Sequence, residues 1–472
     1  MLNFIELDKV IFNSFARLNV KLNNNENKKV LKYIIAVQHN VFDYVRTNSF
    51  SSAKNYSFLK SYIYIKKWLR FYNLDQLAKI LYINKSNYSP YKNVFFAENF
   101  VPHILETFIK IYRKSDTKNF IFLSNDIRAI GYVKKEIDIE CIYYNIFSIS
   151  LADFIISLIK ALRIIKEYKK ERRGIFNEFD YQISKYKSKL NRLFRITLFL
   201  SPLFESVFEK KIDLLSPPKI ILGSDGFYSS RLLLFLARQK KIKTFVIQHG
   251  ILDSYNGYLP LISENIFVWS EFEKKYFCNH NIEPSHILVT GSLKIGEKKY
   301  FEQVQNISTN RLVNVLVTLS PIANSKVKET LDLIISVVEL LSFRYKIIIR
   351  PHPYFKGEIV YLLKKYKNYN FIMDKYSLHK SLFKANIILT EISSIIFDSF
   401  AYEKPIIVFT TPTEFPLNIY GLDILTEPRE ISGLMNNIIN NKDFSKTYCE
   451  KIEKRLIHNQ NAISNIINII EN

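Results

Sequence analysis

Short apolar segments alternate with helical segments from residue 219 onward, and this alternation constrains the fold more than any other feature. Each apolar segment is followed by polar residues and then by a pattern with helical spacing. A strand, a helix and a second strand connected in this way form a right-handed crossover between parallel strands. We expect strands at residues 219–222, 244–247, 266–269, 286–289, 313–319, 345–349, 370–373, 387–389 and 405–409. The sequence therefore predicts an α/β protein built on parallel sheets.

A polar, irregular stretch at residues 297–311 separates two runs of predicted strands. The length of 472 residues also exceeds one ordinary core. We therefore predict an N-terminal domain at residues 1–300, a C-terminal domain at 301–450 and a C-terminal helix at 451–472. The N-terminal domain carries a helical, basic insertion at about 149–210, and a cleft is expected between the two domains.

The N-terminal part of the chain contains four segments whose pattern is less regular. Residues 33–37 and 120–123 are strand-like, whereas residues 58–72 have a helical pattern and are strongly basic. An apolar block at 193–208 contains Pro202, which disfavours a helix interior, so we expect a loop or a lid there.

The formal net charge of +23 favours an anionic partner, although a lysine-rich solvated surface explains the charge equally well. The anionic candidates are nucleic acid, a membrane surface and an anionic substrate. Basic residues are densest at 160–195, beside a helical segment at 149–165 that has one apolar face. That segment is either a core-packing helix with a solvated end or a helix that lies on an anionic bilayer.

The three cysteines are far apart, and no CxxC or Cys/His spacing is present, so neither a disulfide framework nor a zinc site is expected. The first 19 residues lack a basic start and carry acids within their apolar run, unlike a signal peptide. The sequence contains no run of about 18 uncharged apolar residues, so we expect no membrane-spanning helix. We expect a cytoplasmic protein, with the inner membrane surface as a candidate site of peripheral attachment.

A glycine-flanked acid follows the strand predicted at 219–222. Asp225 stands between Gly223 and Gly226 at the carboxyl end of that strand, where the glycines hold an acid with little steric hindrance. In that place Asp225 is a candidate general base for an acceptor hydroxyl group. The alternative is a turn Asp that stabilises its own loop.

His249 follows the next predicted strand and precedes Gly250. A histidine in this place serves as a base, an acid or a hydrogen-bond donor to phosphate, or it only caps backbone groups of the loop. Gly250 favours an unusual backbone angle or the close approach of a ligand. Gly291 and Ser292 follow the strand at 286–289, and we expect them to support the loops at the same sheet edge.

Two prolines enclose a histidine after the strand at 345–349. Pro351 and Pro353 fix the backbone around His352, which aims its ring. A protonated imidazole there stabilises charge on a departing phosphate, or else the ring only braces a rigid turn. Arg350 either adds a bidentate phosphate contact or forms a structural ion pair.

A pair of serines begins a helix after the strand at 387–389. The hydroxyl groups of Ser393 and Ser394 cap that helix or bind phosphate, and both roles are compatible. Glu391 is placed to accept a hydrogen bond from a ribose or sugar hydroxyl. Ligands of open α/β sheets bind at the carboxyl ends of the strands. These residues therefore outline a site for a nucleotide sugar.

Other catalytic motifs are absent from the sequence. There is no GxxxxGK[ST] loop, no GxGxxG, no strong DxD and no GxSxG. We therefore expect no cofactor and no metal ion, and the nucleotide sugar is expected as a substrate.

These motifs resemble those of bacterial GT-B nucleotide-sugar transferases that build surface and capsular polysaccharides. The sialyltransferase-like groups share an acidic-acidic-Gly motif, a His-Pro motif and a Ser pair, which would stand here at residues 224–226, 352–353 and 393–394. Ser224 occupies the leading acidic position, so Asp225 is the only candidate base of that motif.

Two further segments extend the resemblance. Residues 248–250 resemble a segment of capsule and Kdo transferases, and residues 393–405 resemble the nucleotide-binding domain of these enzymes and of CDP-glycerol glycerophosphotransferases. The resemblance covers roughly residues 215–440. It implies a GT-B fold, with two Rossmann-like domains that face a central cleft.

The activity that the resemblance implies is an inverting, metal-independent glycosyl transfer from a nucleotide donor, such as a CMP-sugar, to a glycan or lipid-linked acceptor. Asp225 or His249 would be the base, and His352 would act on the departing phosphate. The alternatives are a CDP-glycerol or polyol-phosphate transferase, a nucleotide-sugar epimerase of the same fold, and a basic nucleic-acid-binding protein. No recognisable nucleic-acid-binding module supports the last of these.

Overall fold

The computed structural model of the chain divides into two compact units. Unit 1 comprises residues 1–267, 277–288 and 463–472, and unit 2 comprises residues 268–276 and 289–462. The structure describes residues 10–18, 29–36, 38, 41, 90–144, 149–179, 183, 186–252, 258–293, 312–319, 324–351, 363, 369, 371–391, 393–400, 402, 404–409, 418–419, 422–456 and 461–472. The predicted domain boundary near residue 300 and the helix predicted at 58–72 lie outside these residues.

The first sheet contains seven strands in the order β3-β2-β1-β4-β5-β6-β7. Its strands are β1 (Asn93–Ala97), β2 (Phe120–Ser124), β3 (Glu140–Tyr143), β4 (Lys219–Leu222), β5 (Lys243–Ile247), β6 (Asn265–Val268) and β7 (Ile287–Val289). The pairs from β3 to β6 are parallel. Because the order reverses between β1 and β4, the crevice outside the carboxyl ends of these two strands is the expected ligand position.

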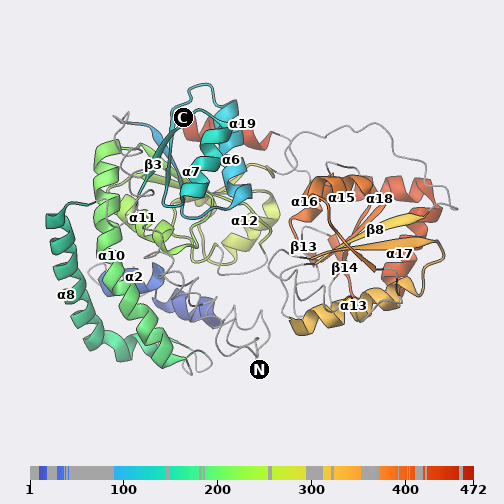
Figure 1. The fold of residues 1–472 in the computed structure, drawn as a ribbon, viewed down its shortest axis with the longest axis horizontal. Coiled ribbons are helices and arrows are strands. Elements are labelled where there is room, and N and C mark those ends of the chain that lie inside the picture. The colour runs from blue at the N-terminus through green and yellow to red at the C-terminus, as the bar shows by residue number, and fades with distance from the viewer. Residues whose placement is uncertain are drawn as a thin grey trace. The chain divides into compact units, whose positions relative to one another are not determined.

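Helices cover both faces of the first sheet. The helices of unit 1 are α2 (Lys29–Ala36), α6 (Pro102–Lys114), α7 (Ile127–Glu136), α8 (Leu151–Phe176), α10 (Lys187–Leu215), α11 (Tyr228–Gln239) and the 3-10 turn η1 (Pro284–His286), and α8 packs outside α10. Most of α12 (Glu271–Cys278) belongs to unit 2. Figure 1 shows α6 and α7 on one side of the sheet and α10 and α11 on the other. Strands covered on both faces need apolar residues throughout, and β1 and β2 are buried along their whole length.

The second sheet repeats the same arrangement. Its order is β10-β9-β8-β11-β12-β14-β13, and only the edge strand β13 is antiparallel to its neighbour. Its strands are β8 (Val313–Thr318), β9 (Tyr345–Arg350), β10 (Phe371–Met373), β11 (Ile387–Thr390), β12 (Ile406–Phe409), β13 (Asn418–Ile419) and β14 (Leu422–Leu425). The order reverses between β8 and β11, which defines the switch point of this sheet.

Alternate residues of the second sheet build a core with two helices. Val315 and Val317 of β8 and Leu389 of β11 pack with buried residues of the helices that cover this face. The helices of unit 2 are α13 (Asn324–Val338), α15 (Leu378–Lys384), α16 (Ile395–Phe400), α17 (Pro428–Asn440) and α18 (Lys442–Leu456). Residues of α13 and α17 belong to this core, whereas α15 and α16 lie on the opposite side of the sheet (Figure 1).

The last helix, α19 (Ala462–Glu471), is attached to unit 1. The hydroxyl groups of Ser115 and Thr117 donate to Glu471 Oε1 at 2.6 and 2.7 Å. Lys219 Nζ donates to the main-chain oxygen of Ile470 at 2.5 Å. Each contact links α19 to a segment at the amino-terminal end of a strand of the first sheet.

The strands predicted from residue 219 onward and at 120–123 are confirmed, but the strand predicted at 33–37 is wrong. This segment belongs to the helix α2, whose residues Tyr33 and Ile34 are fully buried. Spacing alone does not distinguish a short apolar run in a strand from one in a helix that is buried all round. Contacts of α2 with α10 and α11 bury it on several sides.

The loop or lid predicted at 193–208 is also wrong, because this block lies inside α10. Pro202 cannot donate to the helix ladder, which loosens the preceding turn. The main-chain oxygen of Thr197 accepts hydrogen bonds from Ser201 Oγ at 2.7 Å and from Tyr228 Oη at 3.2 Å. The bond from Tyr228 links the turn before Pro202 to α11, and α10 continues past the proline to Leu215.

Candidate functional site

Polar side chains follow the strands that meet at the switch point of the first sheet. Glu98 follows β1, Asp225 follows β4 and His249 follows β5, the strand beside β4. Because the carboxyl ends of parallel strands share one sheet edge, the three residues lie around one crevice. Asp225 and His249 were predicted from the sequence, and Glu98 was not.

A main-chain contact orients the ring of His249. Its Nδ1 lies 2.5 Å from the carbonyl oxygen of Gly223. A carbonyl oxygen only accepts hydrogen bonds, so Nδ1 carries the proton and Nε2 of the neutral ring is unprotonated. Tyr258 Oη lies 2.9 Å from Nδ1 and accepts the main-chain N–H of His249 at 2.9 Å. The contact to Gly223 therefore favours the tautomer in which Nε2 is unprotonated.

A second imidazole stacks on His249. The ring of His103, in the first turn of α6, lies with its centroid 5.2 Å from that of His249, and the planes differ by 22°. His103 is exposed. The sequence signal was a histidine directly after Pro102, at a helix start, but the preceding strand β1 was not predicted. This pair places two imidazoles at the crevice.

Asp225 is fully buried. Its Oδ2 accepts the N–H of Ile262 at 2.9 Å, and its Oδ1 has no hydrogen-bond partner among the described residues. Burial raises the pKa of Asp225 to about 6, although the guanidinium of Arg231 acts in the opposite direction. The N–H of Gly226 donates to Ser224 Oγ at 3.1 Å and closes the turn. This geometry favours a structural role for the carboxylate.

Arg231 connects this turn to the loop that contacts His249. It is fully buried in α11, and it donates to the main-chain oxygens of Ile35 at 3.0 Å and Leu259 at 3.4 Å. The residue before Leu259 is Tyr258, whose hydroxyl contacts His249. Burial lowers the pKa of Arg231 against the opposing effect of the Asp225 carboxylate. Asp225 and Arg231 thus hold the loop that contains Tyr258, whose hydroxyl group contacts the imidazole of His249.

Glu98 caps the start of α11. Its Oε2 accepts the N–H groups of Ser229 at 2.8 Å and Ser230 at 3.2 Å. Burial raises the pKa of Glu98, while these hydrogen bonds lower it by a smaller amount. The sequence signal for Glu98 was an acid directly after an apolar segment, but the strand β1 that this segment forms was not predicted.

The glycines at this sheet edge differ in whether a side chain would fit at their position. A Cβ atom on Gly223 would overlap the side chain of Ile104 in α6, so this position requires glycine. Gly291 has a φ of 98°, in the region that favours glycine, and the neighbouring Ser292 is buried. A Cβ on Gly250 would meet no atom of the described residues within 4 Å. Among these residues, none therefore excludes a side chain at position 250.

The second switch point lies between β8 and β11. Thr318 Oγ1 donates to Thr390 Oγ1 at 2.5 Å where the two strands end. Glu391 follows and is buried, and its Oε1 accepts from Thr330 Oγ1 of α13 at 3.1 Å. The predicted sugar-binding carboxylate is thus held at the switch point of this sheet, next to α13.

The serine pair lies at the start of α16, as predicted. Ser393 Oγ accepts the N–H of Ile395 at 3.4 Å, and the carbonyl oxygens of Ser393 and Ser394 accept N–H groups of Ile396 and Phe397 at 3.1 Å. The predicted cap of the helix by Ser393 is therefore present, although its hydrogen bond is long. Both serine side chains are partly exposed, which is compatible with the phosphate-binding alternative.

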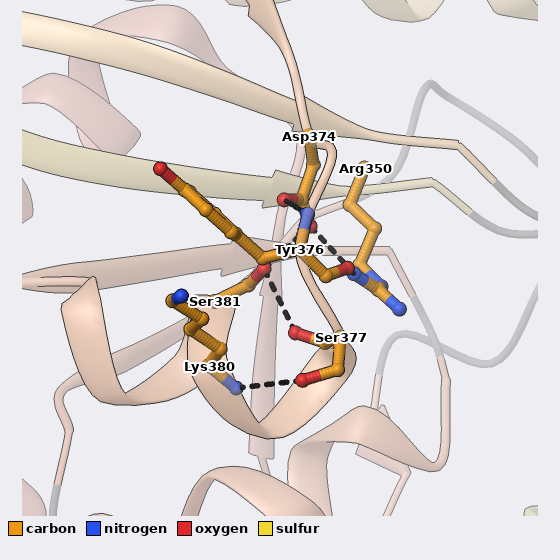
Figure 2. A network of polar contacts seen from close by, with 6 residues as sticks. All are labelled: Arg350, Asp374, Tyr376, Ser377, Lys380 and Ser381. Carbon is orange, nitrogen blue, oxygen red and sulfur yellow. Dashed lines mark hydrogen bonds and ion pairs between the residues drawn. The ribbon is translucent and has the colours of Figure 1, made fainter.

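Arg350 ends β9 in an ion pair, one of the two alternatives from the sequence. Figure 2 shows Arg350 Nη1 beside Asp374 Oδ2, at 2.5 Å, and the same nitrogen donates to the main-chain oxygen of Tyr376 at 3.1 Å. Asp374 is buried and also accepts from Ser381 Oγ at 2.7 Å. This network fixes the segment after β10 against β9.

The strand before the His-Pro motif ends at the same sheet edge as β11. His352 and Pro353 lie outside the described residues, and β9 ends at Arg350, two positions before His352 in the sequence. Only β8 separates β9 from β11, and neighbouring strands are about 4.8 Å apart. The carboxyl ends of β9 and β11 are therefore about 10 Å apart, at the same sheet edge.

Within the described ranges, no three His, Cys, Asp or Glu side chains are arranged to hold a metal ion. None of the helices described is long and apolar enough to cross a membrane.

A family comparison matches part of unit 2. Residues 321–415 match the family described as CDP-glycerol:poly(glycerophosphate) glycerophosphotransferase. The matched segment contains β9, β11 and the serine pair. This match supports the predicted transferase. No curated protein matches the chain.

Solved structures resemble the chain in fold. MnaA from S. aureus in complex with UDP has a TM-score of 0.50 and 12% identity, covering 81% of this chain and 96% of that one. A putative UDP-N-acetylglucosamine 2-epimerase from Listeria monocytogenes has a TM-score of 0.52 and 13% identity, covering 81% of this chain and 96% of that one. The UDP-GlcNAc 2-epimerase from Neisseria meningitidis, bound to UDP-GlcNAc, has a TM-score of 0.51 and 16% identity, covering 81% of this chain and 100% of that one.

The fold is GT-B. Two parallel, Rossmann-like sheets and these structural relatives confirm the predicted fold class. The cleft expected between the domains stays a prediction.

Proposed function

We propose that the chain is an inverting, metal-independent glycosyltransferase that moves a sugar from a nucleotide donor to a hydroxyl group of a glycan or lipid-linked acceptor. The observation that carries the proposal is the orientation of His249 at the switch point of the first sheet. Its Nδ1 contacts the Gly223 carbonyl at 2.5 Å, which leaves Nε2 as the basic nitrogen. The partial family match in unit 2 supports a nucleotide-activated donor.

The proposed reaction is a single displacement. Nε2 of His249 takes the proton of the acceptor hydroxyl as its oxygen bonds to the anomeric carbon. The bond between that carbon and the donor phosphate breaks, and the nucleotide leaves with the electron pair. Attack opposite the leaving group inverts the configuration. Asp225 and Arg231 contribute by holding the loop that contacts His249.

The donor phosphate is proposed to bind at the carboxyl ends of β9 and β11. Ser393 and Ser394 offer partly exposed hydroxyl groups there, and His352 would stabilise the charge of the departing phosphate. Glu391 would bind a ribose or sugar hydroxyl. Arg350 supports this edge through Asp374 and is the weaker candidate for a phosphate contact, because its Nη1 is engaged.

The family match favours one second candidate, a CDP-glycerol or polyol-phosphate transferase. In that reaction the acceptor oxygen would attack the phosphorus atom that carries the polyol, and CMP would leave. The same base would be required, so His249 does not distinguish the two reactions. The donor that is consumed distinguishes them. In either case we propose a cytoplasmic enzyme that works beside the inner membrane.

Thermal unfolding with CMP, CDP, UDP and GDP tests the donor class. A ligand that binds only the folded protein at 100 times its Kd stabilises it by about 2.7 kcal/mol. We expect one or two of these nucleotides to raise the melting temperature, and the S393A/S394A variant to lose this response. A melting temperature that no nucleotide raises would contradict the proposal.

A further inference from the structure

The helix α8 lies at the outer side of unit 1, with α10 between it and the sheet (Figure 1). One face packs against α10 through buried residues such as Ala161, Ile164 and Tyr168. Its N-terminus is capped by Ser150 Oγ, which accepts the N–H of Asp153 at 3.2 Å. The opposite face of α8 is exposed, and its composition is unusual.

Large apolar side chains occupy the first half of this exposed face. Leu151, Ile155, Ile159 and Leu162 follow one another at helical spacing with exposed fractions of 76, 48, 47 and 58%, and Ile156 beside them is 63% exposed. Single exposed apolar residues are normal, but a contiguous group marks an interaction surface.

Cations continue the same line along the second half. Lys166, Lys169 and Arg173 extend the spacing of the apolar residues by three or four residues at each step, and all three are exposed. Arg163 and Lys170 are exposed beside them. We call the set of Leu151, Ile155, Ile156, Ile159, Leu162, Arg163, Lys166, Lys169, Lys170 and Arg173 the outward face of α8.

Two polar contacts fix the rotation of the helix. Lys160 Nζ donates to Glu205 Oε2 of α10 at 2.5 Å. A little over two turns further along α8, Tyr168 Oη donates to Asn191 Oδ1 of α10 at 2.8 Å. Because both partners lie on α10, the outward face is held away from the core of unit 1.

We propose that the outward face of α8 binds the surface of a membrane that contains anionic lipids. Apolar side chains beside cations are the composition of helices that lie in the lipid interface, where the apolar groups enter the acyl boundary and the cations contact phosphates. A second copy of the chain is a poorer occupant, because a two-fold contact would place the cations of one copy against either the cations or the apolar half of the other. Solvent alone would give the apolar residues of this face no apolar contact.

Co-sedimentation of the full chain with vesicles tests the proposal. We expect binding to vesicles of phosphatidylglycerol and phosphatidylcholine, and little binding to phosphatidylcholine alone. Each cation near an anionic surface strengthens binding about fivefold, so K166Q/K169Q/R173Q is expected to bind roughly 100-fold more weakly. I155Q/I159Q/L162Q is expected to lose binding as well. K110Q/K114Q/K134Q, which removes three exposed lysines elsewhere in unit 1, is the matched control.

The control separates a local surface from overall charge. An equal loss of binding in the control variant, or equal binding to vesicles without anionic lipid, would overturn the proposal. So would a dimer of the unaltered chain that I155Q/I159Q/L162Q converts to a monomer in analytical ultracentrifugation. Unchanged circular dichroism melting curves show that each variant folds. Vesicle binding needs no donor, so this result is independent of the proposed transfer reaction.

Discussion

Replacement of Asp225 by Asn tests the roles of the two candidate bases. The substitution keeps the side-chain shape and the hydrogen bond from the N–H of Ile262, but it removes the buried charge. If Asp225 positions the loop and His249 is the base, turnover survives the substitution to within about tenfold, because loss of a general base costs about 10²–10⁴-fold.

The stability effect of this substitution follows from the pKa. Burial raises the pKa of Asp225 from 3.8 to about 6, and one unit corresponds to about 1.4 kcal/mol, so the ionised carboxylate costs the folded state about 3 kcal/mol. The folded protein holds this proton more tightly than the unfolded chain. Stability therefore falls as pH rises from about 4 to 6 and stays low above 6.

An amide at this position avoids the charge but leaves an N–H donor where Oδ1 has no partner. That donor costs about 1–3 kcal/mol. Relative to the unaltered protein, D225N should therefore gain about 3 kcal/mol between pH 4 and pH 8, and it should be equally or slightly more stable at pH 8. Urea unfolding at both pH values measures this difference.

H249N is the matched variant, because the Asn amide can still donate to the Gly223 carbonyl while Nε2 is removed. We expect H249N to lose transfer by about 10²–10⁴-fold and to keep its fold. A folded D225N that loses transfer to this extent, beside an active H249N, would refute the assignment.

Three further substitutions test the structure of unit 1. Buried Glu205 of α10 forms ion pairs with Lys32 of α2 and Lys160 of α8. E205Q breaks this network and should lower the free energy of unfolding at pH 7 by about 3–5 kcal/mol. Burial raises the pKa of Glu205, but the two lysines outweigh it and bring the pKa to about 2, so the loss should shrink as pH falls from 4.5 toward 2 in urea unfolding. G223A should destabilise the fold by about 1–3 kcal/mol in the same assay through its overlap with Ile104. G250A should leave stability unchanged and raise the KM if a substrate approaches this backbone, whereas an unchanged KM would remove that role.

The strands were predictable where local pattern and fold agree. From residue 219 onward, the strands predicted up to residue 409 are short, apolar and bounded by polar residues, and the structure contains each of them, whereas β13 and β14 were not predicted. The helix α2 was mistaken for a strand because its apolar run is buried by α10 and α11, which lie far away in the sequence. Pro202 suggested a loop because the local pattern does not show that Tyr228, 31 residues from Thr197, links the turn before the proline to α11.

The places of the site residues were more predictable than their roles. The sequence put Asp225 and His249 at strand ends, and the sheet order brings those ends together. It did not reveal that Asp225 is buried, because its partner Ile262 belongs to a distant loop. Likewise, Arg350 pairs with Asp374, which lies 24 residues away and follows another strand.

The most direct test of the proposed transfer is the release of CMP from CMP-sugars and CDP-glycerol, measured with and without a glycan or lipid-linked acceptor. The account predicts release that requires the acceptor and is about 10²–10⁴-fold slower in H249N. Release at the same rate in H249N, or conversion of a nucleotide sugar to its epimer without any acceptor, would contradict it.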